Sequence, residues 1–532
     1  AILAKGVILG QRTWFAITSR IEGTFLVTVF TSGMSSGVHS RTADEDAAEV
    51  ALWGGETMVL DGHQEFTIRE LFASKHESRY VLLVSTIAAL NSALLGYDVS
   101  IMSAALVFIR REFQMDDVCE ELVSGILNAA AILGALLGGL SMNAHGRKHV
   151  IALACAFAGI GSVLSGAAMG IKSLLLARAI LGLGIGSVVM AVPVYIAEVV
   201  PLRMRGCLVS LTEVAISVGV FIGFFAGWSI GLTSMTWKWR LMVGVGALPA
   251  LLNLMLLQAL PESPRWMMMR FGPKLAEERF AESGAPAELI REILGSKAQQ
   301  EELDDAAGWR EMLRPTPGLR LSLLVGLGIA VQQQMSGIEA VMYYTPMMLQ
   351  RAGVRSENAQ LFLMLGMGLT KLVATLWSGA IIDRVGRRPL LVGGSVGIAL
   401  CYLVMSASYL SGWLLACVGS FHAFVACYAM SLGPVAWVTI SEVFPTRIRA
   451  QCVAMAVAIN RATSAACVLC FLSLADVMTP AGLFFLLSIG STGAAVFFYA
   501  LLPETRGRSL EEVEQQFAAL ALCAARREAG EV

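Results

Sequence analysis

The chain alternates between long apolar segments and short polar loops over most of its length. Each apolar segment reaches about 20 residues, the length that an α-helix needs to cross a bilayer. We expect twelve of them, at residues 80–109, 121–142, 149–169, 173–198, 207–232, 240–260, 319–349, 358–382, 389–409, 412–443, 451–475 and 479–502. The pattern predicts an all-α membrane protein with twelve transmembrane helices.

Polar segments divide the chain into five parts. Residues 1–78 are mixed in composition and are expected to form a poorly ordered tail. Two six-helix halves are expected at 79–261 and 319–503. The charged residues 262–318 between them are expected to form a linker with short helices, and residues 504–532 a second tail.

Short motifs recur between the two halves at nearly constant spacing. Gly146-Arg147-Lys148 follows the second span, and Gly386-Arg387-Arg388 follows the eighth, 240 positions later. A Glu-x-x-Pro-x-Arg-x-Arg pattern begins at Glu198 after the fourth span and at Glu442 after the tenth, 244 positions later. A Pro-Glu-Ser or Pro-Glu-Thr triplet ends the sixth and twelfth spans. Duplicated halves of this kind are typical of transporters that bind their substrate near the membrane midplane.

Basic residues cluster in the loops that follow even-numbered spans. These loops share one side of the membrane, and the positive-inside rule assigns that side, with both termini, to the cytosol. Arg351 and Arg355 lie in an opposite loop and weaken the contrast without reversing it.

The seventh span carries many polar side chains. They are Gln332, Ser336, Glu339 and Tyr343, which recur at helical spacing and are predicted to share one face, and the flanking Gln333, Gln334 and Tyr344. Amides, carboxylates and phenols form the hydrogen bonds that a hydroxyl-rich solute requires. Helix–helix hydrogen bonds are the alternative, but the cost of intramembrane polar groups favours a site. The helix is expected to loosen at Ser336-Gly337 and at Pro346.

Two charged residues of the first half are expected to meet inside the membrane. Asp98 lies in the first span, and Arg178 in the fourth span is its expected partner. Such a pair is either a static salt bridge or a proton site whose affinity changes with conformation. The sequence leaves both interpretations open.

Further polar groups lie at membrane depth. Glu339 and Lys371 are predicted to interact, because a bundle could hardly leave either charge unpaired. Trp437 follows the bend expected at Gly433-Pro434 and offers an aromatic platform for a sugar ring, although anchoring at the lipid interface is the alternative. The remaining groups are Glu213, Asn460 and Arg461.

The repeated loop motifs carry opposite charges that could pair across helix ends. Ion pairs of this kind would latch the cytosolic side when the protein faces outward and break when it opens inward. Surface ion pairs are individually weak, which suits a latch. Topology signalling by the basic residues is the alternative. The predicted latch residues are Arg147, Glu198 and Arg205 in the first half and Arg387, Glu442 and Arg449 in the second.

Composition agrees with a membrane protein and excludes other classes. Of 532 residues, 56% are hydrophobic and 15% are charged, whereas soluble domains carry about 25% charged residues. The net charge of -1 gives no indication of nucleic-acid binding. Most cysteines lie in apolar segments and are expected to act as small hydrophobes. Because the sequence contains no metal-ligand spacing and no nucleophile–base set, we expect neither a metal, a cofactor nor an enzyme.

Several motifs taken together are highly specific. They are Gly146-Arg-Lys148, Pro261-Glu-Ser-Pro-Arg265, Gln333-Gln-Met-Ser-Gly337, Asp383-Arg-Val-Gly-Arg-Arg388 and Pro503-Glu-Thr-Arg-Gly507. Over about residues 79–516, the chain resembles the sugar porter family of the major facilitator superfamily. Gly96-Tyr-Asp98, Gly125-Ile-Leu-Asn128, Arg314-Pro-Thr-Pro317 and Ser336-Gly-Ile-Glu-Ala-Val341 look closest to plant polyol and monosaccharide proton symporters.

The resemblance implies that two six-helix halves rock around a central sugar site. It also implies that Asp98 carries the coupling proton and that Arg178 is its partner. The substrate-binding residues expected on this basis are Glu213, Gln333, Gln334, Glu339, Tyr343, Tyr344, Lys371, Trp437 and Asn460.

The chain departs from the family pattern at several positions. Glu213, Glu339 and Lys371 stand where many hexose carriers have Gln, Asn and Asn, which resembles the polyol branch. Asn143 replaces the Asp expected by analogy with Asp383, so the latch of the first half is expected to be weaker.

The sequence therefore predicts a monomeric transporter of a monosaccharide or linear polyol, driven by proton symport. We expect it in the lipid bilayer of the plasma membrane, with both termini in the cytosol and no nucleic-acid partner. A facilitative uniporter of the same fold is the nearest alternative. A non-transporting sugar sensor is a further one, disfavoured because only a short tail follows Gly507.

Overall fold

A computed structural model describes residues 14–21, 24–31, 76–200, 208, 210–282, 285, 290, 310–445, 448–508 and 510–528. The chain divides into two units, each described here by itself. In the first, β1 (Trp14–Ile21) and β2 (Thr24–Thr31) form an antiparallel hairpin that pairs Trp14 with Thr31. This hairpin falls within the predicted tail, whose other residues up to 75 lie outside the described part of the chain.

The second unit is helical. The helices that make up its spans are α3 (His76–Leu90), α4 (Ala93–Phe113), α5 (Asp117–His145), α6 (Arg147–Gly166), α7 (Ile171–Val199), α9 (Leu211–Gly231), α10 (Lys238–Gly244), α11 (Ala247–Leu257), α17 (Pro317–Met335), α18 (Ile338–Arg351), α19 (Glu357–Val385), α20 (Arg387–Ser411), α21 (Leu414–Met430), α22 (Pro434–Val443) and α23 (Arg449–Leu501). Four predicted spans correspond to pairs of helices that follow each other directly: α3 with α4, α10 with α11, α17 with α18, and α21 with α22.

Twelve membrane spans result from these helices. Among the described residues, eleven helical segments are long and apolar enough to cross a membrane. The last of them, Gln451–Leu501, contains Thr479 at φ 67° and ψ 156°, directly before Pro480. Because neither residue fits a continuous helix, this segment is two spans that meet at a kink. The spans agree with the predicted boundaries to within about four residues.

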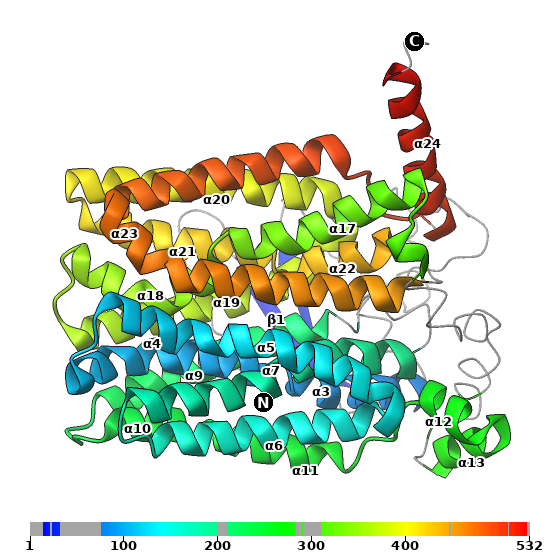
Figure 1. Ribbon diagram of the computed structural model, residues 1–532, viewed down its shortest axis with the longest axis horizontal. Coiled ribbons are helices and arrows are strands. Elements are labelled where there is room, and N and C mark those ends of the chain that lie inside the picture. The colour runs from blue at the N-terminus through cyan, green and yellow to red at the C-terminus, as the bar shows by residue number, and fades with distance from the viewer. Residues whose placement is uncertain are drawn as a thin grey trace, which may run out of the picture. The chain divides into compact units, whose positions relative to one another are not determined.

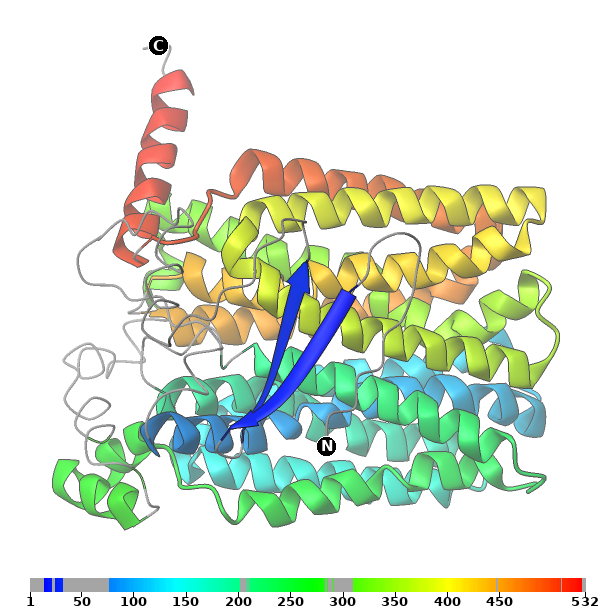
Figure 2. The ribbon, with the colours of Figure 1, turned by 180° about the vertical axis from the view of Figure 1, so that it is seen from behind.

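The spans separate into the two halves that the sequence repeat predicts. Figures 1 and 2 show α3 to α11 gathered in one group and α17 to α23 in the other. The halves pack against each other through α4 with α18, α5 with α23, and α9 with α19. These three helix pairs bring polar side chains of the two halves together.

The helices outside the spans lie at one end of the bundle. The helices α12 (Pro264–Phe271) and α13 (Pro273–Glu282) follow the first half and lie in the predicted linker. The helix α24 (Leu510–Glu528) follows the second half and lies in the predicted second tail. Figure 1 shows all three at the right-hand end, which we call the motif end. The other end is the opposite end.

Two helices that the repeat relates begin in the same way. The Asp116 side chain accepts a hydrogen bond from the Cys119 N–H before α5, and the Ser356 side chain accepts one from the Ala359 N–H before α19. These N-caps satisfy donors that the helix itself leaves unpaired. The backbone hydrogen bond from Cys119 also lowers the pKa of the Asp116 carboxyl.

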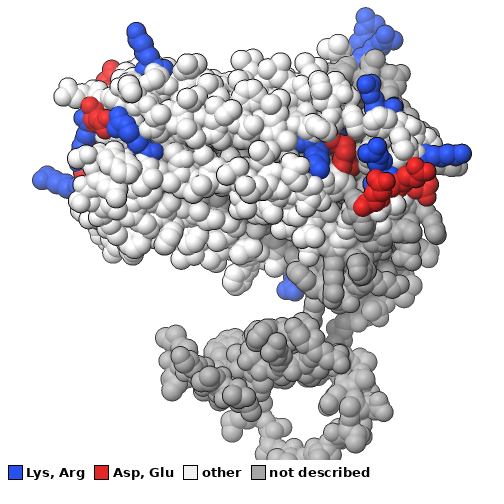
Figure 3. Space-filling view, turned by 90° about the horizontal axis from the view of Figure 1, so that it is seen from below, with Lys and Arg blue, Asp and Glu red and all other residues white. Residues whose placement is uncertain are grey.

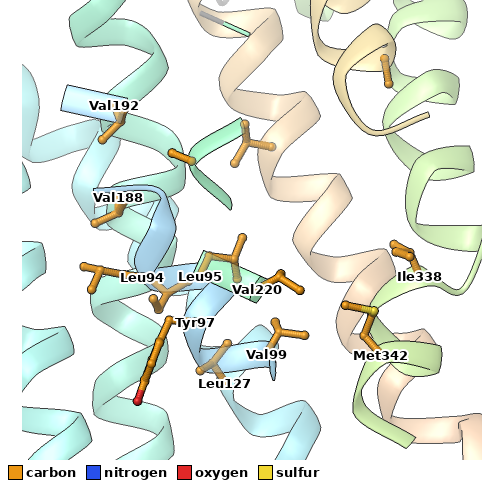
Figure 4. Packing of buried hydrophobic residues seen from close by; sticks show 14 of the residues in the cluster. Leu94, Leu95, Tyr97, Val99, Leu127, Val188, Val192, Val220, Ile338 and Met342 are labelled. Carbon is orange, nitrogen blue, oxygen red and sulfur yellow. The ribbon is translucent and has the colours of Figure 1, made fainter. Parts of the chain in front are cut away.

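The surface and the interior of the helical unit both suit a bilayer. On the face seen in Figure 3, Lys, Arg, Asp and Glu gather toward the two ends and leave an uncharged band between them. Apolar side chains such as Leu140 are exposed in this unit. Inside the first half, Leu94, Leu127 and Val188 come from three different helices and lie in the packed region of Figure 4.

Candidate functional site

Asp98 and Arg178 form a buried ion pair between α4 and α7. The Arg178 guanidinium donates a hydrogen bond to Asp98 Oδ1, and Arg178 is wholly buried. Arg178 Nε also donates to the Val123 carbonyl of α5, at 3.3 Å. The predicted contact is confirmed, and its role as a proton site stays a prediction.

A small cavity adjoins Asp98 on the side of the first half. Its volume is about 10 Å³, and its lining includes Tyr97, Asp98 and Ser162. A cavity of this size has room for about one water molecule. A single water molecule therefore fits beside the Asp98 carboxylate.

Tyr343 of α18 contacts the same ion pair from the other half. Its hydroxyl donates to Asp98 Oδ2 at 3.4 Å and accepts from Arg178 Nη2 at 3.5 Å. Tyr343 is fully buried. The structure thus brings this predicted sugar contact to the predicted proton site.

The seventh span breaks where the sequence predicts. α17 ends at Met335, Gly337 has φ 76° and ψ 11°, and α18 begins at Ile338. Glycine suits this position because a Cβ disfavours positive φ. Pro346, in contrast, lies inside α18 without ending it.

The break overturns the prediction of one continuous polar face. The Ser336 hydroxyl donates to the Gln333 carbonyl at 2.5 Å, and Gln332 lies beside Ser395 and Ser491 of neighbouring helices. Periodicity of 3.6 residues cannot carry a face across a non-helical residue. Glu339, as described below, faces a different set of groups.

Three predicted amides meet beside the break. Asn460 of α23 donates to Gln333 Oε1 at 2.8 Å, and Gln334 Nε2 donates to Asn460 Oδ1 at 3.3 Å. Gln333 also donates to the Leu432 carbonyl at 3.0 Å. All three side chains are buried.

Glu339 is the centre of this polar cluster. Its carboxylate accepts from Gln334 at 3.2 Å, from Asn128 of the first half at 2.9 Å, and from the Ser464 hydroxyl. Its cationic partner is Arg461 of α23, at 2.8 Å. The prediction that Glu339 pairs with Lys371 is therefore wrong. An arginine next to Asn460 at membrane depth was the sequence signal for the correct partner.

Lys371 pairs with Glu213 instead. Lys371 Nζ of α19 lies 3.0 Å from the Glu213 carboxylate of α9 and donates to Ser217 at 3.1 Å. Ser217 and Thr375 share a further hydrogen bond of 2.9 Å. Both charged residues are buried, so α9 and α19 join the halves through an ion pair with its own polar surroundings.

The two predicted aromatic contacts, Tyr344 and Trp437, lie on α18 and α22. The Tyr344 hydroxyl donates to the Val468 carbonyl at 2.9 Å, and its ring stacks on Phe471 with 5.6 Å between centroids. Trp437 is half-buried on α22, which begins at Pro434 after the predicted bend. Neither side chain takes part in the hydrogen bonds of Glu339.

The predicted ion pairs at the motif end form within each half. Arg147 lies 2.8 Å from Glu198, and Arg387 lies 2.9 Å from Glu442. Asp383 adds a second carboxylate to Arg387 at 3.2 Å, at the position where the first half has Asn143. Of the other predicted latch residues, Arg449 donates to the Phe444 carbonyl, and Arg205 lies outside the described residues.

Two glutamates that sequence reasoning missed hold these motifs. Glu262 Oε1 accepts the backbone N–H of Arg147 and Lys148, at 2.9 and 3.0 Å. Glu504 accepts those of Arg387 and Arg388, at 3.0 and 3.1 Å. Each carboxylate thus caps the N-terminus of a helix from far along the chain, as the helix dipole favours. The repeated Pro-Glu-Ser/Thr triplet was the available signal.

Gly146 has to be glycine for this cap to form. Its φ is 92°, and a Cβ would lie 2.4 Å from the Glu262 carboxylate. We expect Gly146→Ala to lower the stability of the purified protein by about 1–3 kcal/mol through backbone strain alone. Thermal unfolding in detergent would measure this loss.

Gly393→Ala is the matched control for that change. Gly393 lies on an exposed face of α20, where a Cβ would meet nothing within 4 Å. Alanine also favours a helix over glycine. Equal unfolding temperatures for the two variants would contradict the proposed constraint at Gly146.

Ion pairs that the sequence did not predict join the halves at the opposite end. Asp117 of α5 binds Arg110 and Arg351, both at 2.6 Å. Arg351, of the second half, also lies 2.9 Å from Asp476, and Arg110 lies 2.8 Å from Glu120. Of these pairs, Asp117–Arg351 links the first half to the second.

Comparisons with known proteins all find similarity to sugar or polyol transporters. Residues 84–517 match the model of a family described as "Sugar (and other) transporter". The chain is 36% identical to "Probable polyol transporter 4" of Arabidopsis thaliana, covering 87% of this chain and 90% of that protein. It is 32% identical to "D-xylose-proton symporter-like 3, chloroplastic" of the same plant, covering 96% and 92%.

A solved structure shares the fold. The proton:xylose symporter XylE of E. coli, bound to 6-bromo-6-deoxy-D-glucose, superposes with a TM-score of 0.71 at 27% identity. The match covers 83% of this chain and 100% of that one. XylE is of the major facilitator superfamily.

Proposed function

Because the chain belongs to the Sugar (and other) transporter family, we propose that it moves a monosaccharide or linear polyol across a membrane by proton symport. It is an integral, multi-pass membrane protein with the major facilitator fold, and it is a transporter and not an enzyme. Its substrates are sugars or polyols, as in its relatives.

The observation that carries the substrate site is a pair of unsatisfied acceptors beside Glu339. Asn128 and Gln334 each donate through their amide nitrogen to the Glu339 carboxylate. Their carbonyl oxygens, Asn128 Oδ1 and Gln334 Oε1, are buried without a hydrogen-bond partner. A buried acceptor costs free energy unless a donor reaches it. Sugar or polyol hydroxyls supply such donors.

The two unsatisfied acceptors come from different halves of the protein. Asn128 belongs to α5 of the first half, whereas Gln334 and Glu339 belong to the second. A substrate that bridges Asn128 Oδ1 and Gln334 Oε1 would therefore favour conformations in which the halves approach each other. Alternating access follows when the motif end and the opposite end open in turn around such a site.

Asp98 is the carboxylate we assign to the coupling proton. It lies apart from the hydrogen bonds of Glu339, so proton and substrate need not compete for one group. Arg178 pairs with this carboxylate and holds the assigned proton site between α4 and α7. Protons are the coupling ion in this scheme, and no cofactor is required.

We assign the motif end to the cytosol. The support is the excess of Arg and Lys in the loops at that end, which the positive-inside rule associates with the cytosolic face. Both chain termini then lie in the cytosol. We further propose that the protein acts as a monomer in the lipid bilayer of the plasma membrane, since each chain carries both halves of the site.

Uptake into proteoliposomes tests the proposal. We would compare glucose, xylose, sorbitol and inositol with and without an inward proton gradient. Accumulation above equilibrium that a protonophore abolishes is the expected result. Equilibration that ignores the gradient would identify a facilitative transporter and reduce Asp98–Arg178 to a structural pair.

Glu339→Gln should shift the preference between polyol and hexose. The change removes a charge that orients four donors, and hydrogen bonds to charged groups contribute about 1.5–3 kcal/mol each. We expect the ratio of the KM for sorbitol to that for glucose to change by roughly 10-fold, the effect of about 1.4 kcal/mol.

Glu278→Gln in exposed α13 is the control for that substitution. It makes the same chemical change far from the cluster, so its KM ratio should equal that of the wild type. An unchanged ratio in Glu339→Gln would remove Glu339 from the substrate site.

A further inference from the structure

We propose that the Tyr343 hydroxyl couples the proton site to the substrate site by positioning α18. The inference rests on the proposed function, because it concerns how proton binding and substrate binding influence each other. Tyr343 then acts through Asp98 and α18, without needing to touch the substrate itself.

The first support is that α18 carries one side chain of each site. Glu339, in the polar cluster, and Tyr343, on the Asp98–Arg178 pair, are four residues apart on this one short helix. Residues at this spacing lie one turn apart on the same side of a helix. A displacement of α18 therefore moves both side chains together.

The second support is the junction from which α18 starts. Gly337 has a positive φ, and α17 ends just before it. Because no continuous helix crosses this residue, α18 can tilt with small dihedral changes, as at other hinges. The second half therefore presents a separable element at its contact with α4.

Two of the contacts between α18 and α4 lie at Tyr343, apart from that of Arg110 with Met347 Sδ at 3.1 Å. The Ser103 hydroxyl lies 2.6 Å from the Met342 carbonyl and 2.9 Å from the Tyr343 carbonyl, so it can donate to either. The other contact is the Tyr343 hydroxyl on Asp98 and Arg178. Ser103 bonds to neutral carbonyls, so of these two contacts only the tyrosine hydroxyl senses the charge of Asp98 directly.

Protonation changes this contact in a definite direction. A charged Asp98 accepts from both Arg178 and Tyr343, and hydrogen bonds to charged groups are stronger than those to neutral groups. When a proton binds a carboxylate oxygen, the charge disappears and the hold on Tyr343 weakens. α18 is then freer to leave α4, and the same proton is released when the contact re-forms.

The groups that face Asp98 come from three helices. They are Arg178 of α7 and Tyr343 of α18, which contact its carboxylate, and Tyr97 of α4, which lines the same small cavity. If α18 links the two sites, then substrate must alter proton affinity by the same factor as the proton alters substrate affinity.

Tyr343→Phe tests the inference, because it removes the hydroxyl and keeps the ring. We would measure uptake of sorbitol or xylose, whichever the wild type accumulates more, in proteoliposomes. The accumulation ratio under a proton gradient should fall toward one, while counterflow without a gradient is retained. The wild-type KM should vary with pH by about 5-fold or more, and that of Tyr343→Phe by less than about 2-fold.

Tyr344→Phe is the matched control. It removes a hydroxyl from the adjacent residue of α18, but that hydroxyl bonds to the Val468 carbonyl and not to the ion pair. Whatever its effect on rate, this variant should keep the pH dependence of the wild type.

The outcomes separate the inference from the proposed function. Wild-type coupling and pH dependence in Tyr343→Phe would overturn the inference, and so would loss of counterflow, which would indicate a role in translocation itself. An equal loss of coupling in Tyr344→Phe would also overturn it. If the wild type itself ignored the proton gradient, the proposed symport would fail first.

Discussion

Asp98→Asn abolishes uphill accumulation of sugar or polyol and leaves downhill exchange measurable. Asparagine keeps the shape of the side chain and an acceptor for Arg178, but it cannot bind and release a proton. A transporter that lacks its proton site equilibrates its substrate instead of concentrating it. Accumulation in proteoliposomes under an inward proton gradient measures the loss, and counterflow shows that the variant still moves substrate.

Asp116→Asn is the control for that change. Asp116 caps α5 through the Cys119 N–H, and asparagine caps a helix about as well as aspartate does. This variant should accumulate substrate like the wild type. Full accumulation by Asp98→Asn would instead show that the Asp98–Arg178 pair is static, which is the alternative that the sequence left open.

Local patterns in the sequence predicted the fold and the Asp98–Arg178 contact of the site. Apolar length specified the spans, and the repeat of Gly146-Arg-Lys148 at Gly386-Arg-Arg388 specified the two halves. The break at Gly337 was also predictable, because glycine tolerates a positive φ. Asp98 and Arg178 could be paired correctly because both lie in the first half, where the choice of partners was small.

The pairing of charges between helices could not be derived in the same way. Two cationic residues, Lys371 and Arg461, could each have packed against Glu339. We predicted Lys371, whereas the structure pairs Glu339 with Arg461. The choice depends on α18 packing against α23 and on α19 packing against α9. Periodicity reports which side of a helix is polar, but not which neighbour that side meets.

The contact of Tyr343 with Asp98 was missed for a related reason. A tyrosine in a polar span next to glutamines fits a sugar contact by residue type. Only the contact of α4 with α18 brings its hydroxyl to Asp98. Likewise, Glu262 was visible as part of a repeat, but its bond to the start of α6 joins residues 115 positions apart.

The Glu213–Lys371 pair provides the second large effect. We expect Glu213→Gln and Lys371→Met each to destabilise the protein by about 3–5 kcal/mol, because either change leaves one buried charge without its partner. The double variant should recover most of that loss, since it removes both charges together. Thermal unfolding of the four proteins in detergent completes a double-mutant cycle.

The recovery is what distinguishes an ion pair from two independent buried residues. Additive losses in the double variant would mean that Glu213 and Lys371 do not interact, and Lys274→Met on exposed α13 controls for the loss of a lysine as such. The pair also spans the interface of α9 and α19, so it stabilises only conformations in which these helices approach. A double variant that regains stability but exchanges substrate at a different rate would therefore show that this ion pair contributes to the balance between conformations as well as to folding.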